Sequence, residues 1–220
     1  MHPVYVHIKK ELSPFYAEEE ASAMAKWISS DILHLSTLEL YTGKDMNFST
    51  KEWEELEDIL RRLKQREPLQ YILQEASFCG MSFHVEQGVL IPRPETEELV
   101  EWIVSDYREA GQVRILDIGT GSGCIPVSLA QLLPEAQVSS CDVSAEALRI
   151  AATNVKRYGD KVTLFCADIL KEELPECQVD VLVSNPPYIT ESERTDMEAN
   201  VLDWEPELAL FVPESDRLRF

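Results

Sequence analysis

The tetrapeptide Asn185-Pro186-Pro187-Tyr188 combines residue types that could hold a planar amino nitrogen for a reaction. Such a nitrogen is a poor nucleophile because its lone pair is delocalised, so chemistry on it needs positioned hydrogen-bond acceptors. The Asn185 side-chain oxygen and the Pro186 carbonyl can each accept one N–H, while the two prolines restrict the loop. The Tyr188 ring can cover the flat face of the substrate. An Asn-Pro pair alone would be typical of a structural turn, whereas the whole tetrapeptide after a strand predicts a reaction loop.

The segment Gly119-Thr120-Gly121-Ser122-Gly123 predicts a site for a nucleotide-like cofactor. Its glycines allow the backbone to turn sharply and approach a ligand, and the helix that follows presents free N–H groups. The spacing is G-x-G-x-G and not the G-x-G-x-x-G that is expected for a dinucleotide. A purely structural tight turn is the alternative interpretation of this segment.

Two acidic positions further along the chain complete the predicted cofactor site. Asp142 follows the last glycine of the segment by 19 positions, and its two carboxylate oxygens could accept from both ribose hydroxyls. Its alternative role is to cap the helix that begins near Ser144. Asp168 and Ile169 follow a third apolar run and would lie near the adenine, although Asp168 could equally cap a turn. The predicted cofactor-binding residues are Gly119, Thr120, Gly121, Ser122, Gly123, Asp142, Asp168, Ile169 and Asn185.

Strand-like and helix-like runs alternate through the second half of the chain. After an amphipathic helix that begins near Pro94, strands are predicted at 113–118, 138–141, 162–165 and 179–184, and helices at 124–133 and 145–158. Such alternation predicts right-handed βαβ crossovers, a parallel sheet and an α/β fold. A fourth strand without an outer neighbour would expose a hydrophobic edge, so we expect a sheet that is truncated at its C-terminal end.

The first part of the chain, up to about Arg66, has a helical pattern. One predicted helix face contains Met24, Trp27, Ile28, Ile32 and Leu35. Ser49 and Glu52 fit a capping box, and the helix that they open carries on one side Trp53, Leu56, Ile59, Leu60 and Leu63. In residues 70–92, apolar and polar side chains alternate and several of the apolar ones are aromatic, which predicts a β-hairpin. We therefore expect a helical domain at 1–69, a β-hairpin linker at 70–92 and an α/β domain at 93–220.

The composition excludes several kinds of site and partner. Forty acidic residues against twenty basic ones give a net charge of -20, which repels phosphate backbones and argues against a nucleic-acid partner. The five cysteines form no C-x-x-C pair and the four histidines have no ligand spacing, so neither a disulfide framework nor a metal site is expected. The cysteines are expected to be small buried side chains. Because there is no signal segment and no membrane-spanning run, we expect a cytoplasmic location and no membrane partner.

The cofactor and reaction loops together resemble those of class I S-adenosylmethionine-dependent methyltransferases that act on planar amino nitrogens. Three further segments resemble the PrmC/HemK family, the glutamine N5-methyltransferases of peptide chain release factors: REPLQYI at 66–72, VLIPRPETE at 89–97 and EPELAL at 205–210. The resemblance implies a Rossmann-like methyltransferase domain at 93–220, preceded by a small all-helical substrate-recognition domain and the hairpin linker. It also implies S-adenosylmethionine as the cofactor and a release factor as the protein partner.

The resemblance assigns roles to individual residues. The glycine segment 119–123 would line the methionine portion of the cofactor, Asp142 would hold the ribose, and residues 185–188 would hold the substrate glutamine amide. Asn185, Pro186 and Tyr188 are thus the candidate catalytic residues, and Pro187 completes the substrate contacts. No general base is required before methyl transfer, because the nitrogen loses its proton readily afterwards. Arg93 and Glu95 would fix the entry of a helix beside the cofactor pocket.

The chain departs from the family pattern at three places. Gln74 stands where the family usually has glycine, which would alter the hairpin turn. Ile169 stands where some members carry an aromatic residue, so stacking against the adenine would be lost. Family members also continue past the position of Phe220 with strands that complete the sheet.

Three other functions share parts of this pattern. Glutamine methyltransferases of ribosomal proteins share the same motifs, and adenine-N6 methyltransferases of nucleic acids use the same loop chemistry. The acidic charge and the lack of a basic, aromatic-rich patch count against a nucleic-acid substrate. A cofactor-binding or protein-docking module without catalysis is the remaining alternative, which only the early end of the chain supports.

Overall fold

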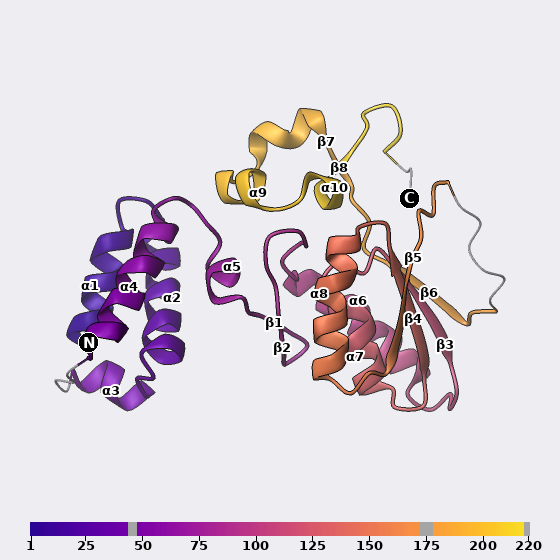
Figure 1. Cartoon of the computed structure of the whole chain (residues 1–220), viewed down its shortest axis with the longest axis horizontal. Coiled ribbons are helices and arrows are strands. Elements are labelled where there is room, and N and C mark those ends of the chain that lie inside the picture. The colour runs from indigo at the N-terminus through magenta and orange to yellow at the C-terminus, as the bar shows by residue number, and fades with distance from the viewer. Residues whose placement is uncertain (44–47, 172–177, 218–220) are drawn as a thin grey trace. The chain divides into compact units, whose positions relative to one another are not determined.

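The computed structural model describes residues 1–43, 48–171 and 178–217. The chain forms two compact units, Met1–Ile72 and Leu73–Phe220, and each is described by itself (Figure 1). A short helix, α5 (Leu69–Leu73), lies where the first unit ends and the second begins. The division into three domains at 1–69, 70–92 and 93–220 stays a prediction.

The first unit is helical, as its sequence pattern predicts. Its elements are α1 (Pro3–Leu12), α2 (Glu18–Trp27), a π-helical turn η1 (Ile28–Ile32), α3 (Thr37–Thr42) and α4 (Thr50–Leu63). The predicted capping box of α4 is confirmed, because Ser49 Oγ accepts from Glu52 N and the Glu52 carboxylate accepts from Ser49 N. Leu56, Ile59, Leu60 and Leu63 are buried. Trp53 is 39% exposed, so the predicted apolar face of α4 enters the core only in part.

The other helix predicted in this unit, with a face from Met24 to Leu35, ends earlier than expected. The α-helix stops at Trp27, and in the π turn Leu33 N donates to Ile28 O, five residues earlier. This wider turn shifts the positions that face inward, so Leu33 is buried whereas Ile32 is only half-buried. Leu35 is buried as well, but it lies beyond the helix.

The predicted β-hairpin is present but much shorter than residues 70–92. Its strands β1 (Ala76–Phe78) and β2 (Met81–Phe83) pair antiparallel, while the residues before them form α5. Phe78 and Phe83 are fully buried and their ring centroids lie 6.1 Å apart. Gln74 adopts a left-handed conformation at φ 54°, which a glycine would adopt without strain. This conformation explains the preference for glycine that the family resemblance implies at this position.

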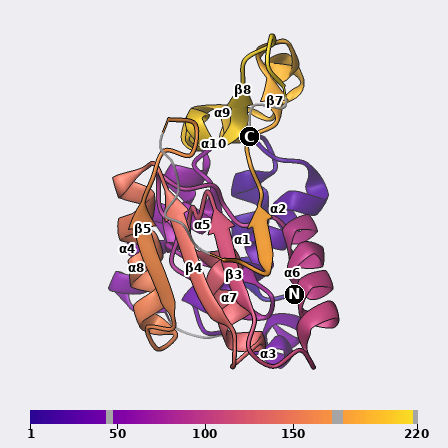
Figure 2. The same cartoon turned by 90° about the vertical axis from the view of Figure 1, so that its right-hand side faces the viewer.

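The second unit is built on a four-stranded parallel sheet with the order β5-β4-β3-β6, which confirms the predicted α/β fold. The strands are β3 (Arg114–Ile118), β4 (Gln137–Asp142), β5 (Val162–Cys166) and β6 (Val181–Ser184). Helices α6 (Pro94–Tyr107), α7 (Cys124–Leu132) and α8 (Ala145–Arg157) cover one face of the sheet (Figures 1 and 2). Side chains from this face, the helices and the hairpin share one hydrophobic core. Leu182 on the edge strand β6 is 61% exposed, while its neighbour Val183 belongs to the core and Val181 packs against it.

The segment after β6 lies beyond the carboxyl ends of the strands (Figure 2). It contains β7 (Ile189–Thr190), a 3-10 helix η2 (Glu191–Asp196), α9 (Ala199–Trp204), α10 (Glu207–Leu210) and β8 (Phe211–Val212). Strand β7 pairs with β8 in parallel. The two ends of this segment are therefore tied together, and we call residues 189–212 the cap.

The thiols differ in exposure more than the sequence predicts. Cys124 and Cys141 are buried and Cys79 is half-buried, but Cys166 is exposed at the end of β5. The fifth cysteine, Cys177, lies outside the described residues. Within the described ranges, no helix is long and apolar enough to cross a membrane.

Candidate active site

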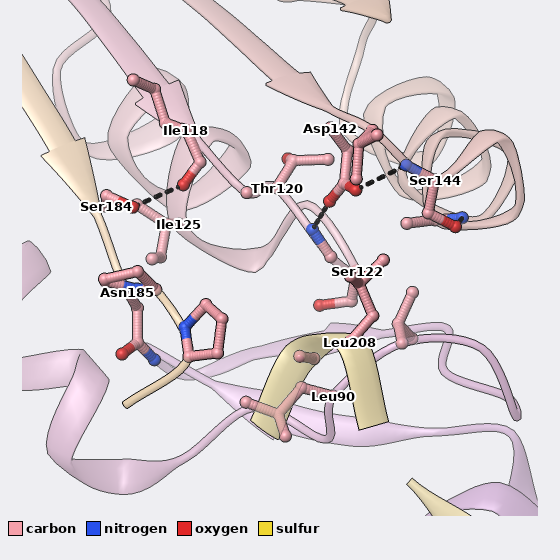
Figure 3. Close-up of a pocket in the computed structure, with 18 of the residues that line it drawn as sticks. Leu90, Ile118, Thr120, Ser122, Ile125, Asp142, Ser144, Ser184, Asn185 and Leu208 are labelled. Carbon is pink, nitrogen blue, oxygen red and sulfur yellow. Dashed lines mark hydrogen bonds between the residues drawn. The ribbon is translucent and has the colours of Figure 1, made fainter. Parts of the chain in front are cut away.

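A cavity of about 190 Å³ lies at the carboxyl ends of the parallel strands. The loop that follows each of the four strands contributes to its wall, which is where open α/β sheets bind their ligands. Figure 3 shows Asp142 toward one end and Asn185 toward the other, with Leu90 and Leu208 along one side. The predicted site residues that line it are Gly119, Thr120, Gly121, Ser122, Asp142, Asp168, Ile169, Asn185, Pro186 and Pro187. Gly123 and Tyr188 do not line this cavity.

The glycines of the loop after β3 have different surroundings. A Cβ at Gly121 would meet no protein atom within 4 Å, so the loop is open where a side chain would stand. A Cβ at Gly123 would instead lie 3.2 Å from Ala151 Cβ on α8. Both residues have a positive φ, which favours glycine. Gly121 thus leaves room in the cavity, whereas Gly123 allows close packing of the loop against α8.

Asp142 at the end of β4 connects the glycine loop to the start of α8. Its Oδ2 atom accepts from Gly121 N at 3.0 Å, and Oδ1 accepts from Ser144 N at 2.9 Å (Figure 3). Ser144 itself is the N-cap of α8, because its Oγ accepts from Ala147 N at 3.1 Å. The alternative capping role of Asp142 is therefore filled by Ser144, and Asp142 lines the cavity.

Asp168 and Ile169 lie in the loop after β5 and also line the cavity. Asp168 Oδ1 accepts from Leu170 N at 3.1 Å, and its Oδ2 accepts from Lys171 Nζ at 2.7 Å. The Asp168 carboxylate thus holds its own turn, which was the alternative role considered from the sequence. A contact of this carboxylate with a ligand stays a prediction.

Sequence reasoning missed Asp117, a fully buried carboxyl group below the glycine loop. Ser140 Oγ donates to its Oδ2 at 2.5 Å, while Asp117 Oδ1 and Thr120 Oγ1 lack a partner with good hydrogen-bond geometry among the described residues. Burial raises the pKa of Asp117 to about 7, although the nearby Ser140 and Thr120 hydroxyls oppose the rise. An acidic residue inside the apolar run of a strand was the signal that could have identified it.

The raised pKa predicts how Asp117 affects stability. In the folded chain this carboxyl binds its proton up to about pH 7, whereas in the unfolded chain it loses the proton near pH 4. Its contribution to the free energy of unfolding therefore falls as the pH rises through this window. Asn carries no titrating proton, so the free energy of unfolding of Asp117→Asn should not show this fall. We expect the difference between the variant and the wild type to shift in favour of the variant by roughly 1–3 kcal/mol from pH 5 to pH 8. Urea unfolding of both proteins at the two pH values measures this difference, and an equal difference at both would contradict it.

Asn154 on α8 is a second residue that the sequence did not reveal. It is fully buried, and its Oδ1 accepts from His84 N at 2.7 Å. Its Nδ2 donates to His84 O at 2.9 Å and to Ser122 O at 2.8 Å. One amide therefore fixes both the segment after the hairpin and the glycine loop to α8.

The reaction loop begins at the end of β6 and is fixed to neighbouring elements. Ser184 Oγ donates to Ile118 O at 2.8 Å, which ties the ends of β6 and β3 together (Figure 3). Asn185 Nδ2 donates to Thr96 Oγ1 at 3.2 Å. The Asn185 Oδ1 atom accepts no hydrogen bond from any residue that the structure describes, so it is available to a ligand.

A second cavity of about 440 Å³ adjoins the first along the reaction loop. Tyr188, which is 70% exposed, lines this cavity together with Met197 and Val201 from the cap. Six residues line both cavities: Leu90, Arg93, Thr96, Asn185, Pro186 and Ala209. The Asn185 side chain is therefore part of the wall that the two cavities share.

A buried carboxylate attaches the cap to the segment before α6. Glu205 Oε1 accepts from Arg93 Nη2 at 2.6 Å, and its Oε2 accepts from Ile91 N at 3.1 Å. Arg93 is the N-cap residue of α6, which agrees with the helix-entry role that the resemblance implies for it. Glu95 lines the second cavity. Sequence reasoning had assigned no role to Glu205 itself.

Comparison with known proteins identifies both parts of the chain. Residues 5–73 match the PrmC N-terminal domain, and residues 96–203 match the methyltransferase small domain. The release factor glutamine methyltransferase of Bacteroides thetaiotaomicron is 49% identical over 221 residues, which cover 100% of this chain and 79% of the relative. That of Flavobacterium psychrophilum is 40% identical over 212 residues, or 95% of this chain and 74% of the relative. A solved structure, the delta-N METTL16 MTase domain, overlaps with 57% of this chain and 61% of its own at 24% identity and a TM-score of 0.45. On the sequence matches, the chain belongs to the release factor glutamine methyltransferase family.

Proposed function

We propose that this chain transfers a methyl group from S-adenosylmethionine to the side-chain amide nitrogen of a glutamine in a peptide chain release factor. The observation that carries the proposal is the position of Asn185, whose side chain lies on the wall between two cavities with its Oδ1 available. One cavity suits a cofactor and the other a protein side chain. Family membership supports the same substrate. Because release factors act in translation, the proposal implies a cytoplasmic location.

The residues around the first cavity fit S-adenosylmethionine. The loop is open at Gly121, and Asp117 Oδ1 and Thr120 Oγ1 provide buried polar atoms beside it. We assign residues 119–122 to the methionine portion, Asp142 to the ribose, and Asp168 and Ile169 to the adenine. When bound, S-adenosylmethionine supplies an electrophilic methyl group.

The reaction loop would prepare the substrate nitrogen for transfer. Asn185 Oδ1 and the Pro186 carbonyl each accept one N–H of the glutamine amide, which favours sp³ character as the lone pair turns toward the methyl group. Tyr188 covers the flat face of the amide, and its exposed ring in the second cavity is compatible with this role. No base is needed beforehand, since the methylated nitrogen loses a proton readily.

Removal of the Asp142 carboxylate should weaken cofactor binding. We expect Asp142→Ala to reduce affinity for S-adenosylhomocysteine by roughly 1.5–3 kcal/mol, the scale of a hydrogen bond to a charged group. Part of this loss would come from the Gly121 N–H, which loses its acceptor. Calorimetric titration measures the affinity, and Asp106→Ala on the exposed face of α6 is the matched control. An unchanged dissociation constant for Asp142→Ala would remove this residue from the site.

A methyl-transfer assay tests the proposed function. The chain is incubated with labelled S-adenosylmethionine and, separately, with a release factor, a ribosomal protein mixture and DNA, and mass spectrometry locates the modified residue. We expect one methyl group on the amide of a release-factor glutamine. Labelling of only a ribosomal protein or DNA, or no labelling at all, would contradict the proposal.

A further inference from the structure

Thr96 lies where the proposed reaction loop meets the start of α6. It is the third residue of that helix, only 8% exposed, and one of the six residues that line both cavities. Its Oγ1 atom accepts from Asn185 Nδ2 at 3.2 Å across 89 positions of sequence. Thr96 is therefore in direct contact with the side chain on which the proposed mechanism depends.

The orientation of the Asn185 amide determines whether it can hold a substrate amide. A carboxamide has one acceptor end and one donor end, and the substrate NH₂ offers only N–H groups to its partners. The bond to Thr96 occupies the donor end of Asn185 and leaves Oδ1 for the substrate. In the opposite orientation, two sets of N–H groups would face each other and could not bond.

The Thr96 hydroxyl is itself held in place by a fixed helix start. Pro94 stands at the first position of α6, where its restricted φ favours the helix. Arg93, directly before it, forms an ion pair with the buried carboxylate of Glu205, and Thr96 N donates to Arg93 O at 3.0 Å. The acceptor that Thr96 presents to Asn185 is thus anchored to both α6 and the cap.

We infer that Thr96 is a positioning residue of the methyl-transfer step, because its hydroxyl accepts from Asn185 Nδ2 and so stabilises the amide with Oδ1 left for the substrate nitrogen. This inference rests on the proposed function. The start of α6 at Pro94-Glu95-Thr96 would then have two roles. It fixes the entry of the chain into the helix, and it orients Asn185 for the reaction.

A Thr96→Val substitution tests the inference, because valine has nearly the shape of threonine but lacks the hydroxyl. We expect Thr96→Val to lower kcat for release-factor methylation by about 10- to 100-fold, since a misoriented catalytic group costs about this much. The KM for the release factor and the dissociation constant of S-adenosylhomocysteine should stay near the wild-type values. Thr96→Ser keeps the hydroxyl and should restore kcat to within about threefold of the wild type. Thr153→Val on the exposed face of α8 is the matched control.

A double-mutant cycle of Thr96 and Asn185 distinguishes an effect on the orientation of the Asn185 amide from an effect on packing around Thr96. A carboxylate has two acceptor oxygens, so Asn185→Asp presents an acceptor in either orientation. In that background, Thr96→Val should cost about threefold or less, compared with its larger cost in the wild type. Thr96→Ala serves as a further variant without the hydroxyl, and circular dichroism and S-adenosylhomocysteine binding report whether each variant folds.

The outcomes distinguish this inference from the proposed function. Wild-type kcat in a folded Thr96→Val or Thr96→Ala variant would overturn the role of Thr96 and leave the proposed function intact. A Thr96→Ser variant as slow as Thr96→Val, or an equal cost in the Asn185→Asp background, would do the same. A wild-type chain that methylates no release factor would overturn both.

Discussion

Asn185→Ala is expected to lower turnover of release-factor methylation by about 10²–10³-fold, the cost of removing one preorganised partner of the transition state. The side chain lies on the wall between the two cavities, and its Oδ1 is the available acceptor there. Because this contact strengthens as the nitrogen becomes sp³, kcat should fall with little change in cofactor affinity.

Initial rates at saturating concentrations of both substrates measure this effect. The control is Asn200→Ala on α9, which makes the same change at a residue that lines neither cavity. Near-normal turnover of Asn185→Ala would contradict the mechanism. A loss caused by poor cofactor binding alone would contradict it as well, and titration with S-adenosylhomocysteine would reveal that.

Asn154→Ala should lower the free energy of unfolding by roughly 3–5 kcal/mol. The substitution removes one buried and two partly buried hydrogen bonds, and it leaves backbone groups of His84 and Ser122 without their partner. Each unsatisfied buried group costs about 1–3 kcal/mol, and the small cavity adds to the loss. Because Ser122 belongs to the glycine loop, cofactor affinity should fall at the same time.

Urea unfolding monitored by circular dichroism measures the stability of Asn154→Ala, with the midpoint and the slope analysed together. Asn200→Ala again provides the control for loss of an asparagine side chain. A decrease below about 1 kcal/mol for Asn154→Ala would show that solvent or a local rearrangement satisfies the His84 and Ser122 backbone groups.

Local patterns in the sequence predicted the strands of the sheet and the loops that follow them. Strands β3, β5 and β6 are rich in apolar residues, whereas β4 (Gln137–Asp142) is largely polar and was predicted from the alternation of strands and helices. Glycine or polar residues lie at or just beyond the ends of these strands, so their carboxyl ends could be recognised without a structure. The capping box at Ser49 is equally local, because both of its hydrogen bonds span three residues. The glycine loop and the reaction loop were found for the same reason, and they line one cavity.

The contacts that orient these loops depend on long-range packing, which no local pattern contains. Asn154 and His84 are 70 positions apart, Asn185 and Thr96 are 89 apart, and Arg93 and Glu205 are 112 apart. In each pair, the residues next to one member in the sequence give no indication of its distant partner. The extent of the hairpin was wrong for a similar reason. Val85, Val89 and Ile91 are buried like strand residues, but only Ala76–Phe78 and Met81–Phe83 pair, and α5 (Leu69–Leu73) precedes them.

A crystal structure with S-adenosylhomocysteine and a glutamine-containing release-factor peptide would test directly whether Asn185 binds the substrate amide. We expect the glutamine amide nitrogen in the second cavity, within hydrogen-bond distance of Asn185 Oδ1 and the Pro186 carbonyl, with Asn185 Nδ2 still bonded to Thr96. We also expect the cofactor to lie against the glycine loop and Asp142. A glutamine side chain bound elsewhere, or an Asn185 side chain that turns its amide nitrogen toward the substrate, would contradict it.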